Sequence, residues 1–242
     1  MTEPHDARST SRRDAILDAL SDEVRALERD AFIPVTESGP FGAGTGFGGA
    51  GIASDLHPHP EFPACNRPMT LFLQLDLASL PAKIAAGEGL AQLWCCVGEC
   101  GIELNDWEPF ARSHVQRIIP VAGVPSSAGT PAPARRVTGW TRVRDIPAYD
   151  DLEAAGITLT DDLLDAVGRA NAPASGDKLA GWPLWVQSPE LPDCPRCGKA
   201  MTYLFQIDSE VNVPFMFGDA GIGHLTQCAD HPDVMGFGWA CG

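Results

Sequence analysis

The chain has 242 residues, of which 44% are hydrophobic, so it can bury a substantial core as one large domain or two smaller ones. Its 17 lysine and arginine residues against 32 aspartate and glutamate residues give a net charge of −15, which repels nucleic-acid phosphates and anionic lipid surfaces. We therefore expect no nucleic-acid partner and no membrane partner, whereas a basic protein partner would suit this charge.

The sequence carries no sign of a targeting or membrane segment. No apolar run approaches the ~20 residues of a membrane span, and the polar residues 1–14 lack the apolar centre of a signal peptide. We expect a cytoplasmic protein. In that reducing compartment its eight cysteines are more readily metal ligands and buried thiols than disulfides.

An amphipathic helix is predicted after a polar tail, within a first segment at 1–38. The pattern predicts a helix over about residues 12–30, with Ser11 and Asp14 resembling a capping box. Its polar face mixes both charge signs, so we expect the apolar face to pack on the core. The apolar residues at helical spacing are Ile16, Leu17, Leu20, Val24 and Leu27.

A glycine-rich stretch follows at 39–51. Its segment 44–49, Gly-Thr-Gly-Phe-Gly-Gly, formally fits a dinucleotide-binding fingerprint, which needs a helix directly after it. Pro58, Pro60 and Pro63 exclude such a helix. The stretch is better interpreted as a loop in which backbone segments cross closely.

The central feature of the sequence is an internal repeat. Residues 61–100 recur without a gap as residues 193–232, and nine of the forty aligned positions are identical. This predicts a first repeat at 39–120 and a second at 139–242, joined by a proline- and alanine-rich linker or loop at 121–138. The expected fold is α+β, with two related, mainly antiparallel sheet-containing halves, an N-terminal helix and a small zinc knuckle.

The two repeats are predicted to share their strands. Apolar, β-compatible runs indicate strands at 69–77, 90–97, 201–208, 222–228 and 236–241. Short helices are expected at 150–156 and 160–170, the second with Thr160 as its N-cap.

The strongest chemical signal is a set of cysteines with metal-ligand spacing. Cys194 and Cys197 form a C-x-x-C turn, and two thiolates so placed can take two corners of a zinc tetrahedron. Cys228 and His231 supply a second pair after the next predicted strand. Cys241 is an alternative fourth ligand, but in a simple hairpin it would lie ~15 Å from Cys228 at ~3.3 Å per residue. We therefore expect zinc on the first four residues.

A redox dithiol is the competing interpretation of Cys194 and Cys197. The low thiolate pKa of such dithiols owes much to a helix that follows them. Residues 199–208 instead have the pattern of a strand, which favours structural zinc.

The first repeat carries an incomplete version of the same set. Cys65 and Cys96 match Cys197 and Cys228, and Cys100 lies one place beyond the position that matches His231, but Phe62 stands where Cys194 would be. The site is then degenerate or empty, filled by Cys95, His57 or His59, or held open. Cys95 fits poorly because adjacent strand residues face opposite ways.

An open three-ligand zinc site would suit a hydrolase, so Cys65, Cys96 and Cys100 also form a candidate catalytic site. No H-E-x-x-H motif and no Gly-x-Ser-x-Gly elbow accompany them. We favour a protein without enzymatic activity and identify no catalytic residue.

Two further groups of residues have structural and functional interpretations. The matched pairs Gln74 with Asp76 and Gln206 with Asp208 could bind a ligand but are more typical of side chains that cap turns. The aromatic set of the second repeat could line a pocket, although filling the core beside the metal suits its apolar neighbours better. That set comprises Trp182, Trp185, Phe215, Phe217 and Trp239.

Several blocks of the sequence resemble the YwqG-like family of bacterial proteins, a domain of unknown function. The resemblance covers roughly residue 41 to the C-terminus, and its most specific blocks are Gly-Trp-Pro-Leu-Trp-Val-Gln at 181–187 and Phe-Gln-Ile-Asp at 205–208 with Gly-Asp-Ala-Gly at 218–221. Ala180 stands where relatives often have a glycine. The C-x-x-C motif with its following strand and later cysteine is also similar to the programmed-cell-death protein 2 family, which is likewise duplicated.

These resemblances imply an α+β fold of two related halves and no established enzymatic activity. The second, more distant one implies protein binding or the chaperoning of a client. Together with the cysteine pattern, they lead us to expect a zinc-binding protein that acts in protein–protein interaction or client binding.

Overall fold

The computed structural model describes residues 7–83, 87–98, 105–128 and 131–242. Their main feature is one sheet of ten strands in which every neighbouring pair is antiparallel. In sheet order the strands are β14 (Met235–Ala240), β13 (Ile222–Gln227), β12 (Thr202–Asp208), β11 (Lys178–Ala180), β1 (Arg29–Ser38), β10 (Arg135–Asp145), β2 (Gly46–Phe47), β6 (Thr70–Asp76), β7 (Leu90–Cys95) and β8 (His114–Ile119).

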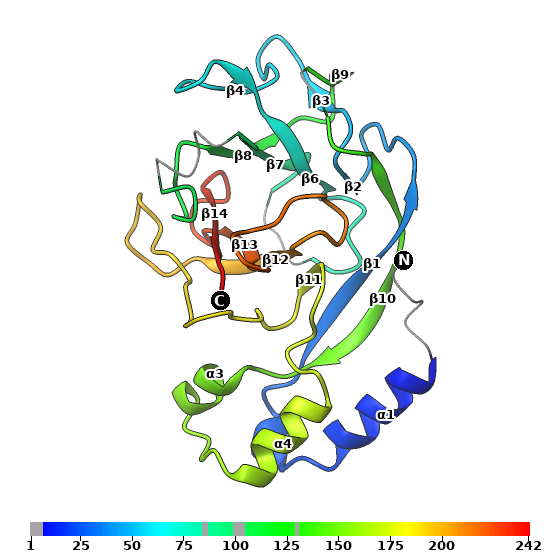
Figure 1. The fold of residues 1–242 in the computed structure, drawn as a ribbon, viewed down its shortest axis with the longest axis vertical. Helices are drawn as coiled ribbons and strands as arrows, with labels where there is room; N and C mark the ends of the chain where they lie inside the picture. The colour runs from blue at the N-terminus through cyan, green and yellow to red at the C-terminus, as the bar shows by residue number, and fades with distance from the viewer. Residues whose placement is uncertain (1–6, 84–86, 99–104, 129–130) are drawn as a thin grey trace.

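The predicted antiparallel character is confirmed, but the α+β class is corrected to a mainly antiparallel β fold with a few short helices. Strands of both repeats also join one sheet rather than forming one sheet each. The long pair β1 and β10 lies between them, paired from Arg29 opposite Asp145 to Ser38 opposite Arg135. This pair extends below the body of the molecule (Figure 1).

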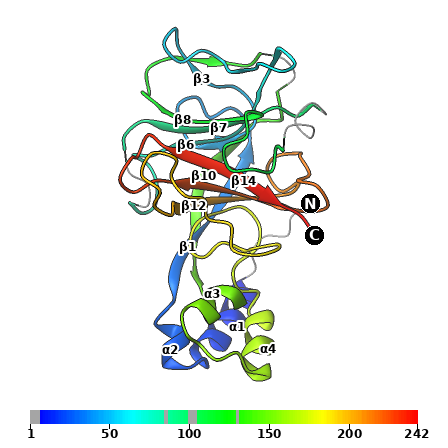
Figure 2. The same ribbon diagram turned by 90° about the vertical axis from the view of Figure 1, so that its left-hand side faces the viewer.

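The sheet curls until its two end strands meet, which makes it a nearly closed, barrel-like sheet (Figure 2). The chain ahead of β8 completes the closure by pairing with β14. The backbone N–H of Phe237 donates to the carbonyl of Pro109 over 2.9 Å, and that of Trp239 donates to Trp107 over 3.1 Å. The main core lies inside this curl and includes Phe72, Phe205 and Phe237.

The helices gather at the far end of the β1 and β10 pair (Figure 1). They are α1 (Ala7–Asp18), α2 (Asp22–Arg25), α3 (Tyr149–Ala154) and α4 (Asp161–Arg169). They share a small core of their own, made of Leu17, Val24, Ile146, Leu152, Val167 and Ala170. Among the described residues, no helix has the length and apolar character needed to cross a membrane.

The single helix predicted over about 12–30 is wrong in its bounds. Ser11 lies inside α1 rather than capping it, so the predicted capping box is also wrong. The chain breaks after Asp18, and the Ser21 hydroxyl then caps α2 by accepting from the N–H of Val24 over 3.4 Å. The prediction of Thr160 as N-cap of α4 is confirmed, because its hydroxyl accepts from the N–H of Leu163 over 3.2 Å.

The internal repeat is visible in the strand registers. Gly46 lies opposite Gln74 in the first repeat, and Lys178 lies opposite Gln206 in the second, each pair 132 residues from its counterpart. Both repeats also have a register shift at the same place, between Leu71 and Leu73 and between Tyr203 and Phe205. The duplicated unit therefore begins before the stretch in which sequence identity is apparent.

The glycine-rich stretch forms β2 inside the sheet, so the dinucleotide-binding interpretation is wrong and a close backbone crossing is what is found. Gly48 and Gly49 have φ of +60° and +63°, and their counterparts Ala180 and Gly181 have +58° and +75°. Ala180 thus adopts a left-handed conformation that favours glycine.

The stretch 121–138, expected as a linker or loop, contains strands. It holds β9 (Val124–Ser126), which pairs with β3 (Gly51–Ala53), and the first residues of β10. A further two-stranded ribbon, β4 (Glu61–Phe62) with β5 (Arg67–Pro68), precedes β6. The division into repeats remains a prediction, with this segment contributing to the sheet.

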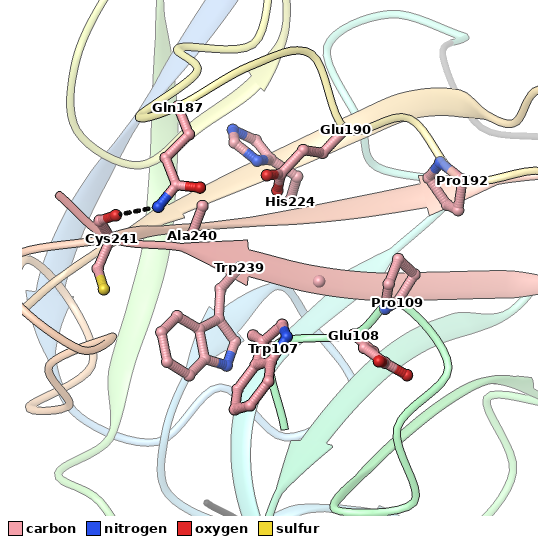
Figure 3. Close-up of a pocket in the computed structure, with 11 residues that line it drawn as sticks. Trp107, Glu108, Pro109, Gln187, Glu190, Pro192, His224, Trp239, Ala240 and Cys241 are labelled. Carbon is pink, nitrogen blue, oxygen red and sulfur yellow. Dashed lines mark hydrogen bonds between the residues drawn. The ribbon is translucent and has the colours of Figure 1, made fainter. Parts of the chain in front are cut away.

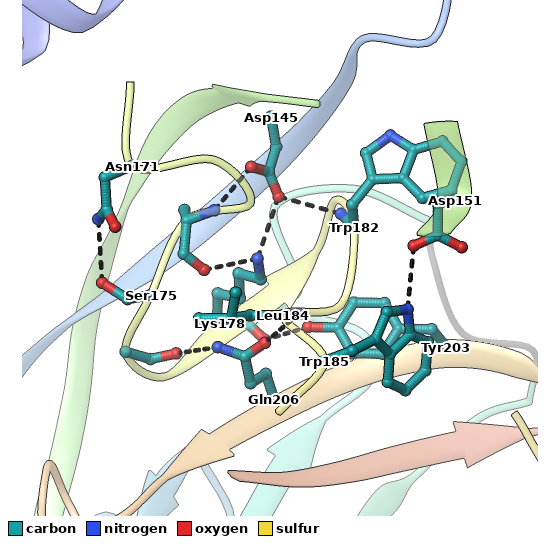
Figure 4. A network of polar contacts seen from close by, with 12 residues as sticks. Asp145, Asp151, Asn171, Ser175, Lys178, Trp182, Leu184, Trp185, Tyr203 and Gln206 are labelled. Atoms are coloured by element: carbon teal, nitrogen blue, oxygen red, sulfur yellow. Dashed lines mark hydrogen bonds and ion pairs between the residues drawn. The ribbon is translucent and has the colours of Figure 1, made fainter. Parts of the chain in front are cut away.

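A buried ion pair of Asp145 and Lys178 lies at the centre of a network of polar contacts (Figure 4). Asp145 and Lys178 are fully buried, with 3.1 Å between the Asp145 Oδ2 and the Lys178 Nζ. Asp145 also accepts from Arg13 over 3.1 Å and from the backbone N–H groups of Ala174 and Trp182 over 2.8 and 3.0 Å. Its carboxylate is satisfied on all sides, as a buried charge requires.

Candidate metal centre

The first pair of candidate ligands lies on a tight turn that precedes β12. The N–H of Gly198 donates to the carbonyl of Cys194 over 2.8 Å, and the N–H of Cys194 donates to Lys199 over 2.8 Å. Gly198 has φ of +69°, which turns the chain so that both cysteine side chains lie on one side. No helix follows Cys197, so the feature that would favour a redox dithiol is missing here.

The second pair lies where β13 turns into β14. Cys228 directly follows β13, and His231 lies in the seven-residue turn at 228–234. The N–H of Cys228 donates to Val234 over 3.0 Å, and the N–H of Val234 donates to His231 over 2.8 Å. These bonds hold the turn so that His231 faces back toward the cysteines.

The structure brings the ligand atoms of Cys194, Cys197, Cys228 and His231 together, all within 4.8 Å of one another. The Cys197 and Cys228 sulfurs are 3.7 Å apart, and the His231 Nδ1 lies 3.6 Å from the Cys228 sulfur and 3.9 Å from that of Cys194. Zinc–ligand bonds of ~2.0–2.3 Å in a tetrahedron place neighbouring ligand atoms ~3.5–3.8 Å apart. The four residues could therefore hold a metal ion.

The acidity of the thiols fits a cation site. Burial raises the pKa of the Cys194 thiol, but hydrogen bonds from the backbone N–H groups of Arg196 and Cys197 and from the nearby thiols outweigh it and lower the pKa to about 6. The N–H of Lys199 favours the thiolate of Cys197, yet burial and the charge of Cys194 raise the pKa of this second thiol. A bound cation would remove that repulsion.

Two exposed ion pairs connect the two turns. Arg196 donates to both carboxylate oxygens of Asp233 over 2.9 and 2.6 Å, and Lys199 donates to Asp230 over 2.6 Å. Beneath the ligands lies a small apolar cluster to which Met201 and Val234 contribute. The site is thus a compact knuckle on the outer end of β12 to β14.

Cys241 does not join this group. It follows β14 at the end opposite the turn, and a Cβ atom placed on Gly218 would lie 2.5 Å from its sulfur. The preference for His231 over Cys241 thus agrees with the hairpin geometry.

The first repeat has the same turn without the same ligands. The Cys65 and Cys96 sulfurs lie 3.9 Å apart, and Phe62 is buried at the position that corresponds to Cys194. Cys95 packs in the main core and Cys96 in a different cluster, so the two face opposite ways as predicted. Cys100 lies outside the described residues. Within the described ones, no second group of three metal-ligating side chains comes together.

The alternative ligands proposed for the first repeat, His57 and His59, do not form a metal-ligating group with the cysteines in the described part of the chain. The two ring nitrogens of His59 contact the carbonyl of Met69 at 2.9 Å and the hydroxyl of Ser126 at 3.3 Å. His57, in a turn with Ser54, joins no such group of described residues. The hydrolase interpretation of Cys65, Cys96 and Cys100 accordingly gains no support from the described part of the chain.

The matched glutamines are structural. Gln74 accepts from the N–H of Ile52 over 3.1 Å, and Gln206 accepts from the N–H of Leu184 over 2.9 Å, again 132 residues apart. Both amide groups also donate to loop carbonyls, and both side chains are fully buried. They fasten the crossing segment to the sheet rather than facing a ligand.

The aromatic residues of the second repeat do not pack beside the candidate metal centre, so that prediction is wrong. The indole N–H of Trp182 donates to Leu27, and that of Trp185 donates to Asp151 (Figure 4). The core-filling part of the prediction holds for Phe217, which belongs to the main core, and for Phe215 and Trp239, which pack against it; Trp239 also lines a pocket. The alternative interpretation, that this set lines a pocket, is confirmed for Trp239. The buried pair of Asp145 and Lys178 was not predicted, since it depends on residues that only sheet pairing brings together.

The fold and the site define a class of protein: a mainly antiparallel β protein with a nearly closed, barrel-like sheet and a three-cysteine, one-histidine group at one end of that sheet. The chain belongs to the family described as a domain of unknown function, DUF1963, which matches residues 45–226. A search of curated proteins finds no match. The YwqG-like and programmed-cell-death protein 2 resemblances stay predictions.

The family match begins at Thr45, one residue before β2, and so includes the start of the duplicated unit. It contains Cys194 and Cys197 but ends before Cys228 and His231. The family match therefore includes only half of the candidate ligand group.

Proposed function

We propose that this protein binds one zinc ion at Cys194, Cys197, Cys228 and His231, and that the zinc has a structural role in a non-enzymatic, partner-binding protein. The observation that carries the proposal is the convergence of three thiol sulfurs and one imidazole nitrogen within 4.8 Å of one another, with three of the distances between 3.6 and 3.9 Å. Three thiolates and an imidazole favour zinc over magnesium or calcium, which prefer oxygen ligands.

A structural role follows from the number of ligands. Catalytic zinc sites keep a position open for water or substrate, whereas four protein ligands close the tetrahedron. The zinc would tie the turn ahead of β12 to the turn between β13 and β14, which are otherwise connected by exposed ion pairs. Exposed pairs of this kind stabilise weakly.

A partner-binding role is supported by the surface of the second repeat. The net charge of −15 favours a basic partner. Leu191, three residues before Cys194, is 41% exposed, and Trp107 and Phe110 beside β14 are 44% and 42% exposed. Exposed apolar side chains near a rigid knuckle are suited to an interaction surface.

The test is metal stoichiometry of the purified protein by elemental analysis. We expect one zinc per chain, close to none in Cys197→Ser, and an unchanged value in Cys241→Ser, whose thiol lies away from the group. A wild-type protein purified without zinc that also fails to bind added zinc would refute the proposal.

The Cys65→Ser variant separates one site from two. Because Phe62 replaces a ligand in the first repeat, we expect this variant to keep one zinc per chain. A wild-type value of two that drops to one in Cys65→Ser would instead place a second metal in the first repeat.

A further inference from the structure

A pocket of about 550 Å³ lies beside β14, away from the metal ligands. Its lining includes the indoles of Trp107 and Trp239, the carboxylate side chains Glu108 and Glu190, the imidazole of His224, and Gly238. Figure 3 shows His224 and Glu190 on one side of β14 and the two indoles on the other. One of these residues, His224, has a counterpart in the first repeat whose contacts indicate the kind of group that could bind here.

His224 of the second repeat corresponds to Gln92 of the first. Gln92 lies on β7 and His224 on β13, 132 residues apart. The Gln92 amide donates to the carbonyl of Ile52 over 2.9 Å, and His224 has a hydrogen bond with the backbone of the corresponding residue, Leu184. The two side chains therefore hold equivalent crossing segments in the same way.

In the first repeat, the side-chain oxygen of Gln92 accepts a hydrogen bond from an arginine. Arg117 on β8 lies directly opposite Gln92, and its Nε donates to the Gln92 Oε1 over 2.9 Å. The guanidinium also lies 5.7 Å from the centre of the Trp94 ring. An oxygen acceptor and an indole thus bind a guanidinium that belongs to the chain itself.

In the second repeat that arginine is missing. The residue opposite His224 is Gly238, and the chain from Trp107 to Pro109 packs against it, since a Cβ atom there would lie 3.0 Å from the Trp107 carbonyl oxygen. His224 is 5% exposed, and among the described residues its Nε2 has no hydrogen-bond partner. A buried polar atom without a partner is unfavourable and indicates a missing ligand.

The imidazole presents an acceptor at this nitrogen. Burial, with the nearby charge of Lys178, lowers the pKa of His224 to about 3, against the effect of the Leu184 backbone bond, so the ring is neutral. A neutral imidazole has one donor nitrogen and one acceptor nitrogen. With Nε2 as the acceptor, a ligand that satisfies it must bring an N–H or O–H donor.

The walls of the pocket favour a positive charge on that donor. The Trp107 and Trp239 rings meet edge to face with their centres 6.4 Å apart, and indoles attract cations at their faces. Glu108 and Glu190 add two carboxylates, while no lysine or arginine lines the pocket among the described residues.

We propose that this pocket binds a guanidinium group, free or as an arginine side chain of a partner. An arginine side chain would identify the chemistry of the partner in the proposed function, and only this step rests on that function. The pocket itself does not include the metal ligands.

The experiment is calorimetric titration of the zinc-containing protein with two capped tripeptides, N-acetyl-Gly-Arg-Gly-amide and the same peptide with citrulline, and with agmatine. Citrulline has nearly the shape of arginine without its charge. We expect the arginine peptide to bind at least ~10-fold more tightly than the citrulline peptide, the size of one lost charged contact. If agmatine binds as tightly, a free guanidinium suffices; if only the peptide binds, the ligand is a protein segment.

Variants connect the binding to the pocket. His224→Leu and Glu190→Gln should each weaken the arginine peptide ~10-fold, whereas Glu61→Gln, at an exposed position on β4 in the first repeat, should leave binding unchanged. Zinc content is measured in each variant, so loss of the metal and loss of the pocket are distinguishable. Equal affinity for arginine and citrulline, or no binding at ~10 mM ligand, the range of the weakest specific contacts, would overturn the inference.

Discussion

Phe62 and Cys194 accept the same backbone hydrogen bond in the two repeats. The N–H of Asn66 donates to Phe62 over 2.8 Å, and the N–H of Gly198 donates to Cys194 over 2.8 Å. Asn66 and Gly198 also share a left-handed conformation, with φ of +52° and +69°. One turn therefore carries an apolar side chain in the first repeat and a candidate metal ligand in the second, so two different interactions stabilise the same local structure.

This difference predicts that zinc removal changes the effect of a substitution at Cys194 but not that of a substitution at Phe62. Phe62→Ala should lower the free energy of unfolding by ~3–5 kcal/mol, because a buried aromatic side chain is lost, and by the same amount with or without EDTA. Cys194→Ala should destabilise the protein in zinc and have little effect in EDTA. Urea unfolding in both conditions measures this.

Cys241→Ala is the matched control for that experiment, because it removes a thiol outside the candidate metal centre. Its effect should not depend on zinc. An equal loss for Cys194→Ala in zinc and in EDTA would mean that Cys194 acts only as a buried side chain.

The buried ion pair of Asp145 and Lys178 should be sensitive to removal of either partner. Asp145→Asn leaves the fully buried Lys178 and the nearly buried Arg13 without their carboxylate, so we expect a loss of ~3–5 kcal/mol in unfolding free energy. Lys178→Met should be less harmful, since Arg13 still pairs with Asp145. Chemical denaturation measures both.

A double variant, Asp145→Asn with Lys178→Met, should be less destabilised than the sum of the single variants, because it removes Lys178, one of the two cations that Asp145→Asn leaves unpaired, and only Arg13 then lacks its carboxylate. Asp30→Asn, which breaks the exposed pair with Arg142, should have no measurable effect. Additive losses in the double variant would show that the two side chains do not stabilise each other.

Acid should destabilise the protein through its buried histidines. Burial lowers the pKa of His224 to about 3 and that of His114 to about 4, against 6.5 ordinarily. Below pH ~6.5 the unfolded chain binds protons that the folded chain does not, so the stability that these neutral rings contribute is lost as the pH falls from 6.5 toward 4. Each ring contributes up to ~1.4 kcal/mol per pH unit in that window.

The variant His224→Gln introduces the residue that the first repeat uses at this position, Gln92. Between pH 6 and 4 it should reduce the slope of unfolding free energy against pH by ~1.4 kcal/mol per pH unit, which corresponds to one proton. Comparing variant and wild type under EDTA removes the contribution of metal release. Parallel slopes would show that His224 is protonated in the folded protein.

The repeat made much of the second half predictable from the sequence. Aligning Phe62 with Cys194 identified which turn lacks a ligand, because the turn geometry depends on local residues such as Gly198. The strands that bury Gln74 and Gln206 were likewise visible as apolar runs. Alternation of polar and apolar residues and turn chemistry are local properties, and a sequence records them directly.

The parts that the sequence did not predict depend on distant contacts. β1 contains Pro34, which lies opposite Trp140 of β10, a partner separated from it by the whole first repeat and the stretch 121–138. The Pro- and Ala-rich stretch ahead of β10 gave no indication that the sheet would continue through it. The pocket depends on Gly238 and Trp107, which meet only because the sheet curls closed.

The two copies of the repeat differ most in one connection. Between β7 and β8 the chain has eighteen residues, 96–113, whereas between β13 and β14 it has seven, 228–234. The longer connection supplies Trp107 and Pro109, which pair with β14 and form a wall of the pocket. The longer connection therefore places residues of the first half against β14 of the second, while the short one keeps the spacing that brings Cys228 and His231 together. The pocket and the candidate metal centre thus both depend on loop length, in which the two halves differ, and not on the strands that they share.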